Sequence, residues 1–173
     1  FCTPHQYVDV YVDGRDVYSL KETAGRWGHT TGHVWNFVLL PVNTTHLTVK
    51  LSPCYPETAN ALLTYYVGNG REICMGLMRQ SLPTFIISFI ILIVGIYMLG
   101  YWLLVCKSED VDATLLYLGL FSVILGLWTA NETDFAKLLL VNQHATTFAA
   151  YILLMAMPIP FVLFVRSFQA AFL

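Results

Sequence analysis

Residues 82–105 read LPTFIISFIILIVGIYMLGYWLLV and contain no charged side chain. At the rise of an α-helix this stretch would reach roughly 36 Å, which is enough to cross a bilayer core about 30 Å thick. We therefore expect a transmembrane helix here. The residues before it are polar enough for a water-exposed folded module, and most residues after it are apolar enough for lipid. The sequence thus predicts an extramembrane module followed by a membrane domain.

Two further apolar stretches follow, at 113–130 and 145–165, after the polar loop CKSEDVD at 106–112. The second stretch has 18 residues, which is close to the lower limit for a spanning helix. Within the third, Pro158 and Pro160 lack amide donors, so we expect the helix to kink or open just before them. None of the three stretches contains Asp, Glu, Lys, Arg or His, which argues against an ion pathway or a proton relay.

The composition places the chain among membrane proteins. Hydrophobic residues make up 57% of the 173 residues and charged residues 12%, against about 25% charged in an average soluble domain. The nine Lys and Arg are scattered and the net charge is -2, so no basic patch for nucleic acid is expected. No signal sequence precedes Phe1, and Leu173 ends an apolar run, so we expect an internal piece of a longer protein.

The four cysteines are Cys2, Cys54, Cys74 and Cys106. No two of them stand at a metal-ligand spacing such as CxxC, so we expect no zinc site and no cofactor. The first three precede the apolar stretches, and an oxidising compartment would permit one bridge, for example between Cys2 and Cys54. Unpaired, partly buried thiols are the alternative that we favour.

Residues 7–12 (YVDVYV) alternate, with three valines on one face and Tyr, Asp and Tyr on the other. A period of two predicts a half-buried strand. Asp13 and Gly14 follow at once, a pair suited to the positive φ angles of a type I′ turn, and residues 16–20 return as a second strand. This is the clearest hairpin signal in the chain.

Three more strands are expected at 34–40, 46–52 and 62–67, with turns rich in Gly, Pro and Asn between them. Five or more short strands at close spacing predict an antiparallel β-sandwich of jelly-roll-like type. The expected fold class is therefore a β-sandwich followed by three transmembrane helices.

We divide the chain into a sandwich over 1–70, a short helical connector over 71–81 and a membrane domain over 82–173. The connector leads into Pro83, which the first turn of a helix would tolerate because the amide donor there has no partner to lose. A rigid connector could carry strain from a bound ligand into the membrane, whereas a Gly and Ser linker could not.

Three stretches carry a resemblance to a known family: LTYYVGNGREI at 63–73, LGLFSVILGLWTANET at 118–133 and MPIPFVLFVR at 157–166. Together with the CKSEDVD loop, they make the chain resemble bacterial seven-transmembrane receptors with diverse intracellular signalling modules. The branch that it resembles most ends in a diguanylate cyclase (GGDEF) domain. The resemblance covers the end of the sensor and the first three of seven spans.

This resemblance implies that the sandwich lies outside the bacterial cytoplasmic membrane and that an output domain lies inside. The CKSEDVD loop would then be cytoplasmic and residues 131–144 external; the charges near the spans do not decide the orientation by themselves. The chain contains no GGDEF stretch and no histidine-kinase box. We therefore assign catalysis to none of its residues.

Four residues in and beside a Gly-rich loop form the candidate ligand site: Trp27, His29, His33 and Trp35. The resemblance implies a sensor similar to carbohydrate-binding modules, in which aromatic faces stack on sugar rings. In the alternative interpretation, Trp35 is a core residue of its strand and Trp27 caps an edge. The glycines beside the two histidines disfavour a helix, so a metal site is not expected there.

The candidate residues for signal relay lie near the ends or bends of the second and third spans: Trp128, Asn131, Glu132, Pro158 and Pro160. The polar residues could receive a signal from the sandwich, and an ordinary solvated helix end is the alternative. The prolines supply a bend that could switch between two arrangements. Ser122 and Gly126 form a small-xxx-small step, for which we consider intramolecular packing first and a homodimer second.

We therefore expect a transmembrane sensory receptor in which the sandwich binds a ligand and the helices relay the signal to a cytoplasmic output domain. The expected partners are membrane lipid and an extracytoplasmic ligand, with carbohydrates among the candidates. The competing hypothesis is a membrane-anchored binding or assembly protein without an output domain. A polytopic enzyme acting on lipid has almost no support from the residues.

Overall fold

The computed structural model describes residues 1–21, 30–59, 64–106, 113–140 and 142–172. Their contacts divide the chain into two compact units. The first, which we call the strand unit, comprises Phe1–Gly76 and Lys137–Phe148. The second, which we call the helical unit, comprises Leu77–Ala136 and Ala149–Leu173.

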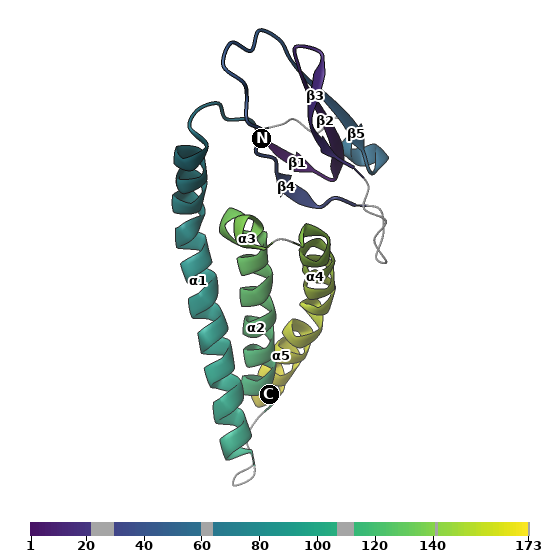
Figure 1. The fold of residues 1–173 in the computed structure, drawn as a ribbon. Coiled ribbons are helices and arrows are strands. Elements are labelled where there is room, and N and C mark those ends of the chain that lie inside the picture. Colours follow the sequence, from purple (N-terminus) through teal and green to yellow (C-terminus); the bar gives the residue numbers. More distant parts are fainter. Residues whose placement is uncertain (22–29, 60–63, 107–112, 141, 173) are drawn as a thin grey trace. The chain divides into compact units, whose positions relative to one another are not determined.

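The strand unit contains two small antiparallel sheets (Figure 1). In the larger sheet, β2 (Gln6–Val12) lies between β3 (Arg15–Leu20) and β5 (Leu47–Pro53). In the smaller sheet, β1 (Cys2–Pro4) pairs with β4 (His33–Trp35). A short 3-10 helix, η1 (Pro56–Thr58), follows β5. The structure thus confirms an antiparallel sheet region ahead of the apolar helices, while its completion as a sandwich stays a prediction.

The central strand β2 has the alternating burial that its sequence predicts. Val8, Val10 and Val12 are 1%, 1% and 4% exposed, and the residues between them are half-buried. Asp13 and Gly14 have φ angles of 48° and 81°, as a type I′ turn requires. The hairpin of β2 and β3 is therefore confirmed, and the strand expected at 46–52 is present as β5, paired along all of β2.

The Asp13 carboxylate ties the hairpin turn to the chain just before β5. Its Oδ1 atom accepts hydrogen bonds from the Thr45 hydroxyl at 2.7 Å, the His46 amide at 2.8 Å and the Thr45 amide at 3.2 Å. These bonds, above all the one from the Thr45 hydroxyl, hold the pKa of Asp13 below its usual value. The turn thus favours the charged carboxylate.

The strand expected at 34–40 is wrong beyond its first two residues. The pairing of β4 with β1 extends only to Asn36, whose amide donates to the Phe1 carbonyl at 2.8 Å. No strand among the described residues pairs with 37–40, and apolar alternation alone does not satisfy the backbone hydrogen bonds of a strand. These four residues are irregular and line a cavity described below.

The strand expected at 62–67 is also wrong where it can be compared. Residues 62 and 63 lie outside the described residues. Thr64 forms an isolated bridge, in which its carbonyl accepts from the Cys2 amide at 3.0 Å, and residues 65–67 are irregular and exposed. A single bridge does not build a ladder, so the segment remains a loop.

The helices are α1 (Gly70–Val105), α2 (Thr114–Glu132), α3 (Asp134–Leu139), α4 (Gln143–Ala156) and α5 (Pro158–Phe172). Among the described residues, three helical stretches are long and apolar enough to cross a membrane: α1, α2, and α4 with α5 over Gln143–Ala170. The three spans expected from the sequence are confirmed at this level.

The expected connector and the first span form one uninterrupted helix, α1, of 36 residues. Pro83 was expected in the first turn of a helix and instead lies in the interior of α1. It cannot donate to the carbonyl of Arg79, four residues earlier. Because Arg79 is exposed, solvent can hydrate the freed carbonyl there.

The third span is interrupted, as Pro158 and Pro160 predicted. The helix α4 ends at Ala156, Met157 lies between the two helices, and α5 begins at Pro158. The two prolines cannot donate to the carbonyls of Leu154 and Ala156. Pro160 is buried and Pro158 is exposed, so the break lies partly inside the helical unit.

Small residues let α1 and α2 approach closely. The buried Ser88 and Gly95 of α1, and the buried Gly119 and Gly126 of α2, each stand seven residues apart. A Cβ atom on Gly126 would lie 2.9 Å from the Ser88 carbonyl oxygen. Gly126 therefore packs within the chain, as expected, but its companion on α2 in this contact is Gly119 rather than Ser122.

None of the four cysteines, all of which the structure describes, forms a disulfide bond, and each is half-buried. The backbone of Cys54 donates to the His5 carbonyl at 2.9 Å, and Cys2 lies on β1. The bridge considered between Cys2 and Cys54 is not formed in the structure.

Candidate functional site

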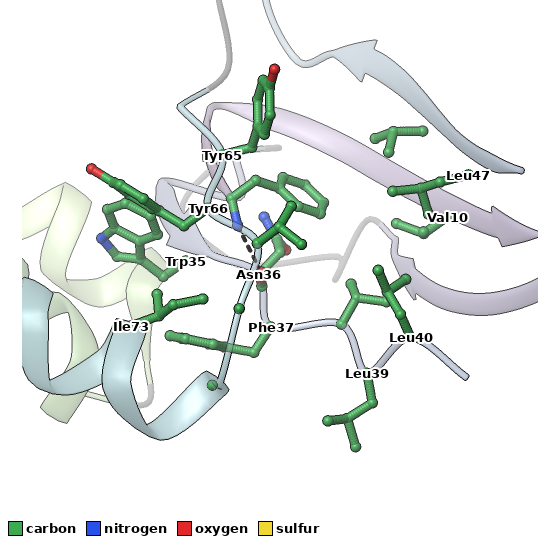
Figure 2. A pocket seen from close by; sticks show the side chains of 16 residues that line it. Val10, Trp35, Asn36, Phe37, Leu39, Leu40, Leu47, Tyr65, Tyr66 and Ile73 are labelled. Atoms are coloured by element: carbon green, nitrogen blue, oxygen red, sulfur yellow. Dashed lines mark hydrogen bonds between the residues drawn. The ribbon is translucent and has the colours of Figure 1, made fainter. Parts of the chain in front are cut away.

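A cavity of about 600 Å³ opens in the strand unit (Figure 2). Side chains of 16 residues line it, and none of them is Asp, Glu, Lys, Arg or His. They are Phe1, Val10, Trp35, Asn36, Phe37, Val38, Leu39, Leu40, Leu47, Val49, Tyr65, Tyr66, Val67, Gly68, Gly70 and Ile73. We call this cavity the apolar pocket.

One end of the apolar pocket is aromatic. The rings of Trp35 and Tyr66 have centroids 6.0 Å apart and an interplanar angle of 31°. Figure 2 shows Phe37 and Ile73 at the same end as this pair, whereas Leu47 lies at the opposite end. The ends of the pocket thus come from segments far apart in the sequence.

Asn36 is the only amide side chain in the lining, and its polar atoms are already used. Its Oδ1 accepts from the Tyr18 hydroxyl at 2.7 Å, and its Nδ2 donates to the Thr3 hydroxyl at 2.8 Å and the Val34 carbonyl at 3.2 Å. Asn36 is 2% exposed, and burial raises the pKa of Tyr18, which keeps its hydroxyl a neutral donor. Asn36 therefore holds the wall of the pocket together.

The beginning of α1 also lines the apolar pocket, through Gly70 and Ile73. Asn69 caps this helix: its Oδ1 accepts from the Arg71 amide at 3.0 Å, and its carbonyl accepts from the Ile73 amide at 3.0 Å. The cap holds the first turn in a defined geometry. A molecule in the pocket would therefore touch the same helix that forms the first membrane span.

The structure places two of the four residues of the candidate ligand site. Trp27 and His29 lie outside the described residues. Trp35 lines the apolar pocket, whereas the His33 ring packs edge-on against His5, with centroids 5.1 Å apart. His33 and Trp35 are neighbours on β4 but belong to different clusters of side chains.

The cluster around His33 is centred on His5. The His5 ring also contacts Tyr55, with centroids 5.9 Å apart, and its Nδ1 shares a hydrogen bond with the Thr30 hydroxyl. Within the described part of the chain, no group of three or more His, Cys, Asp and Glu side chains is arranged to hold a metal. The contacts that are described make this a packed cluster beside β4.

A second, smaller cavity of about 280 Å³ lies in the helical unit, and most of the residues that line it are polar. It brings Trp128 and Glu132, two of the candidate relay residues, together with Gln80, Ser81 and Thr84 of α1. The remaining lining residues are Thr129, Thr133 and Asp134. We call this set the polar cluster.

Asn131 does not line the polar cluster, and the break at Pro158 and Pro160 belongs to α4 and α5. The five candidate relay residues therefore do not form one site. Aromatic contacts tie the surrounding helices together: Phe85 of α1 packs on Phe135 of α3 with centroids 4.6 Å apart.

Sequence reasoning missed most of the apolar pocket. The sequence predicts a strand around Tyr66, another strand around Asn36 and Phe37, and a connector that contains Ile73. The available signal was the run YYVGNG at 65–70, which places two aromatic rings directly before the first turn of a helix. Nothing local in the sequence indicates that Asn36 would lie beside that run.

Comparisons of the chain with protein-family models, with curated proteins and with solved structures give no significant match. The resemblance to bacterial seven-transmembrane receptors therefore stays a prediction.

Proposed function

We propose that the chain is part of a transmembrane sensory receptor, in which a ligand held by the strand unit changes the arrangement of the membrane helices. One observation carries the proposal. Gly70 and Ile73 line the apolar pocket, and the helix to which they belong continues without interruption to Val105. Occupancy of the pocket would act directly on the first membrane span.

The route from the pocket follows one face of α1. Ile73, Leu77 and Ser81 stand four residues apart, a spacing that places them along the same side of a helix. Ile73 lines the apolar pocket, Leu77 is buried, and Ser81 lines the polar cluster. A small shift or rotation of α1 that accommodates a ligand at Ile73 would therefore move Ser81 against Glu132.

The break between α4 and α5 is the proposed flexible element of the helical unit. Packed helices switch between discrete arrangements more easily where a helix is already interrupted. Pro158 and Pro160 supply that interruption, and the rings of Phe121 and Phe161, 5.3 Å apart, connect α5 to α2. A displacement of α2 would be passed on at this point.

The remaining parts of the proposal come from the resemblance alone. They are a jelly-roll-like sandwich outside the bacterial cytoplasmic membrane, a membrane domain of seven spans and a cytoplasmic output domain of the diguanylate cyclase type. The native coding sequence beyond Leu173 tests them directly. Four more apolar spans followed by a GGDEF domain are expected, and a stop codon soon after Leu173 would contradict them.

The relay itself can be tested with the tryptophans of the chain. Trp35 lines the apolar pocket, Trp102 lies in α1 and Trp128 lines the polar cluster. In protein labelled with 5-fluorotryptophan and placed in lipid nanodiscs, each gives a 19F resonance that single Trp→Phe variants assign. We would fill the pocket with Leu40→Phe and use Val42→Phe as the matched control.

Leu40 lines the pocket, whereas Val42 lies two residues further along the same segment, is 91% exposed and does not line it. Leu40→Phe should shift the resonances of Trp35, Trp102 and Trp128, and Val42→Phe should leave all three unchanged. A shift of the Trp35 resonance alone would contradict the proposed relay and favour the competing hypothesis, a membrane-anchored binding protein.

A further inference from the structure

We propose that the apolar pocket takes a free, uncharged small molecule whose buried part is an alkyl chain or an aromatic ring. This names the ligand class of the same pocket on which the proposed receptor function rests. The volume of about 600 Å³ is within the range of roughly 300–1,000 Å³ that is usual for small-molecule sites.

The lining excludes charged ligands. No lining side chain is Asp, Glu, Lys, Arg or His. The amino group of Phe1 is ionisable, but it already donates to the Asn36 carbonyl at 3.0 Å, and burial lowers its pKa, which favours its neutral form. A carboxylate, phosphate or ammonium group placed there would lose its hydration without gaining an opposite charge from any lining side chain. The buried part of the ligand is therefore neutral.

The lining also disfavours a ligand covered with hydroxyl groups, such as a sugar. Asn36 has no side-chain donor left, because both N–H groups of its amide are already used. In Figure 2 the hydroxyl oxygens of Tyr65 and Tyr66 point away from Asn36 and the centre of the pocket. Buried hydroxyls of a sugar would lack partners, and an unpaired buried polar group is costly.

The aromatic end is suited to an apolar body rather than to a sugar ring. Tyr66 already packs against the indole of Trp35, so the indole is not a freely exposed stacking platform on that side. Leu40, Leu47 and Val49 complete an aliphatic wall. Alkyl and aromatic groups gain from leaving water for such a surface without needing directed hydrogen bonds.

The membrane supplies such molecules at high local concentration. Ile73, in the pocket wall, and Leu82, the first residue of the apolar run, are nine positions apart on α1. At the helical rise this is roughly 14 Å along the axis. A molecule that partitions into the bilayer is thus enriched close to the beginning of the helix that lines the pocket.

The test titrates the full chain in nanodiscs with 1-octanol, as the apolar probe, and with cellobiose, as the sugar probe. The readout is the 19F resonance of Trp35 in 5-fluorotryptophan-labelled protein. We expect a saturable shift with 1-octanol and none with cellobiose. Leu40→Phe should weaken the apparent affinity for 1-octanol by about tenfold, and Val42→Phe should leave it unchanged.

Three results would overturn the proposal. The first is a Trp35 shift that does not saturate with 1-octanol, or that has the same apparent affinity in Leu40→Phe. Such a shift would reflect partitioning of 1-octanol into the bilayer. The second is a saturable shift with cellobiose alone. The third is a Trp35 resonance that stands at its ligand-bound position in nanodiscs before any 1-octanol is added and moves to the unbound position in lipid-free amphipol. This result would show that a lipid chain occupies the pocket.

The same spectra separate this inference from the receptor function. Shifts of the Trp102 and Trp128 resonances on adding 1-octanol that also occur in Leu40→Phe do not depend on the pocket. We take them as the background effect of octanol in the bilayer. A saturable response at Trp35, with only this background at the other two, supports the ligand class and refutes the relay. A response of all three tryptophans to cellobiose and not to 1-octanol supports the relay and refutes the ligand class.

Discussion

Gly95 of α1 and Gly119 of α2 face each other at a close approach of the two helix backbones. A Cβ atom on Gly95 would lie 3.0 Å from the Gly119 carbonyl oxygen and 2.8 Å from the Val123 amide nitrogen. Both contacts are with backbone, which cannot move aside as the end of a flexible side chain can. The α1 and α2 packing therefore depends on the absence of a side chain at Gly95.

Replacing Gly95 by Ala should destabilise the helical unit. We expect a loss of about 1–3 kcal/mol in the free energy of unfolding, the usual cost of overpacking. Gly100→Ala is the matched control, because it lies in the same helix and a Cβ there meets no described atom within 4 Å. It should be neutral or slightly stabilising. Unfolding in mixed micelles measures both variants, and equal effects would contradict a close contact at Gly95.

Replacing Tyr18 by Phe should loosen the wall of the apolar pocket. The variant leaves Oδ1 of the buried Asn36 without the Tyr18 donor, at a cost of about 1–3 kcal/mol. Tyr11→Phe is the control, because no hydrogen bond of the Tyr11 hydroxyl is found among the described residues. Hydrogen exchange read by mass spectrometry should show faster exchange around Asn36 in Tyr18→Phe alone. Unaltered protection in that variant would show that the bond contributes nothing.

The hairpin turn should depend on pH through Asp13. The Thr45 hydroxyl and the amides of His46 and Thr45 hold the pKa of Asp13 below its usual value, so they stabilise the fold when the carboxylate is charged. This contribution is complete above the pKa of the unfolded chain and is lost as the pH falls through the lowered pKa of the folded protein. The turn should therefore loosen in acid.

The measurement is the exchange protection of the Thr45 and His46 amides, corrected for the intrinsic rate at each pH. Asp13→Asn is the comparison, because asparagine tolerates the positive φ of 48° and has no carboxylate to titrate. Protection should fall with acid in the native sequence and stay nearly constant in Asp13→Asn. Parallel curves for the two proteins would exclude Asp13 as the titrating group.

The sequence by itself determined the parts of this protein that follow from local chemistry. The length and apolarity of 82–105 predict a helix able to cross a membrane, and the alternation of 7–12 with Asp13-Gly14 predicts the hairpin. The break before Pro158 is equally local, because a missing amide donor acts within one helical turn.

The lengths of β4 and of the expected strand at 62–67 were decided by the tertiary structure. A strand extends only as far as a neighbouring strand supplies hydrogen bonds. The pattern of apolar residues predicts neither where β1 ends nor that Thr64 forms only a single bridge. The same holds for Gly126, whose contact with Ser88 depends on the register between two helices.

The apolar pocket, too, was decided only by the tertiary structure. Trp35 lies near other aromatic residues in the sequence. In the pocket, however, it lies with Tyr66 and Ile73, which come from a loop and a helix more than thirty residues later. Periodicity reports which residues share a face of one element, and it carries no information on which distant elements meet. The apolar helices follow from the sequence because each is long and apolar enough to cross a bilayer by its own composition, whereas a pocket exists only where separate segments pack together.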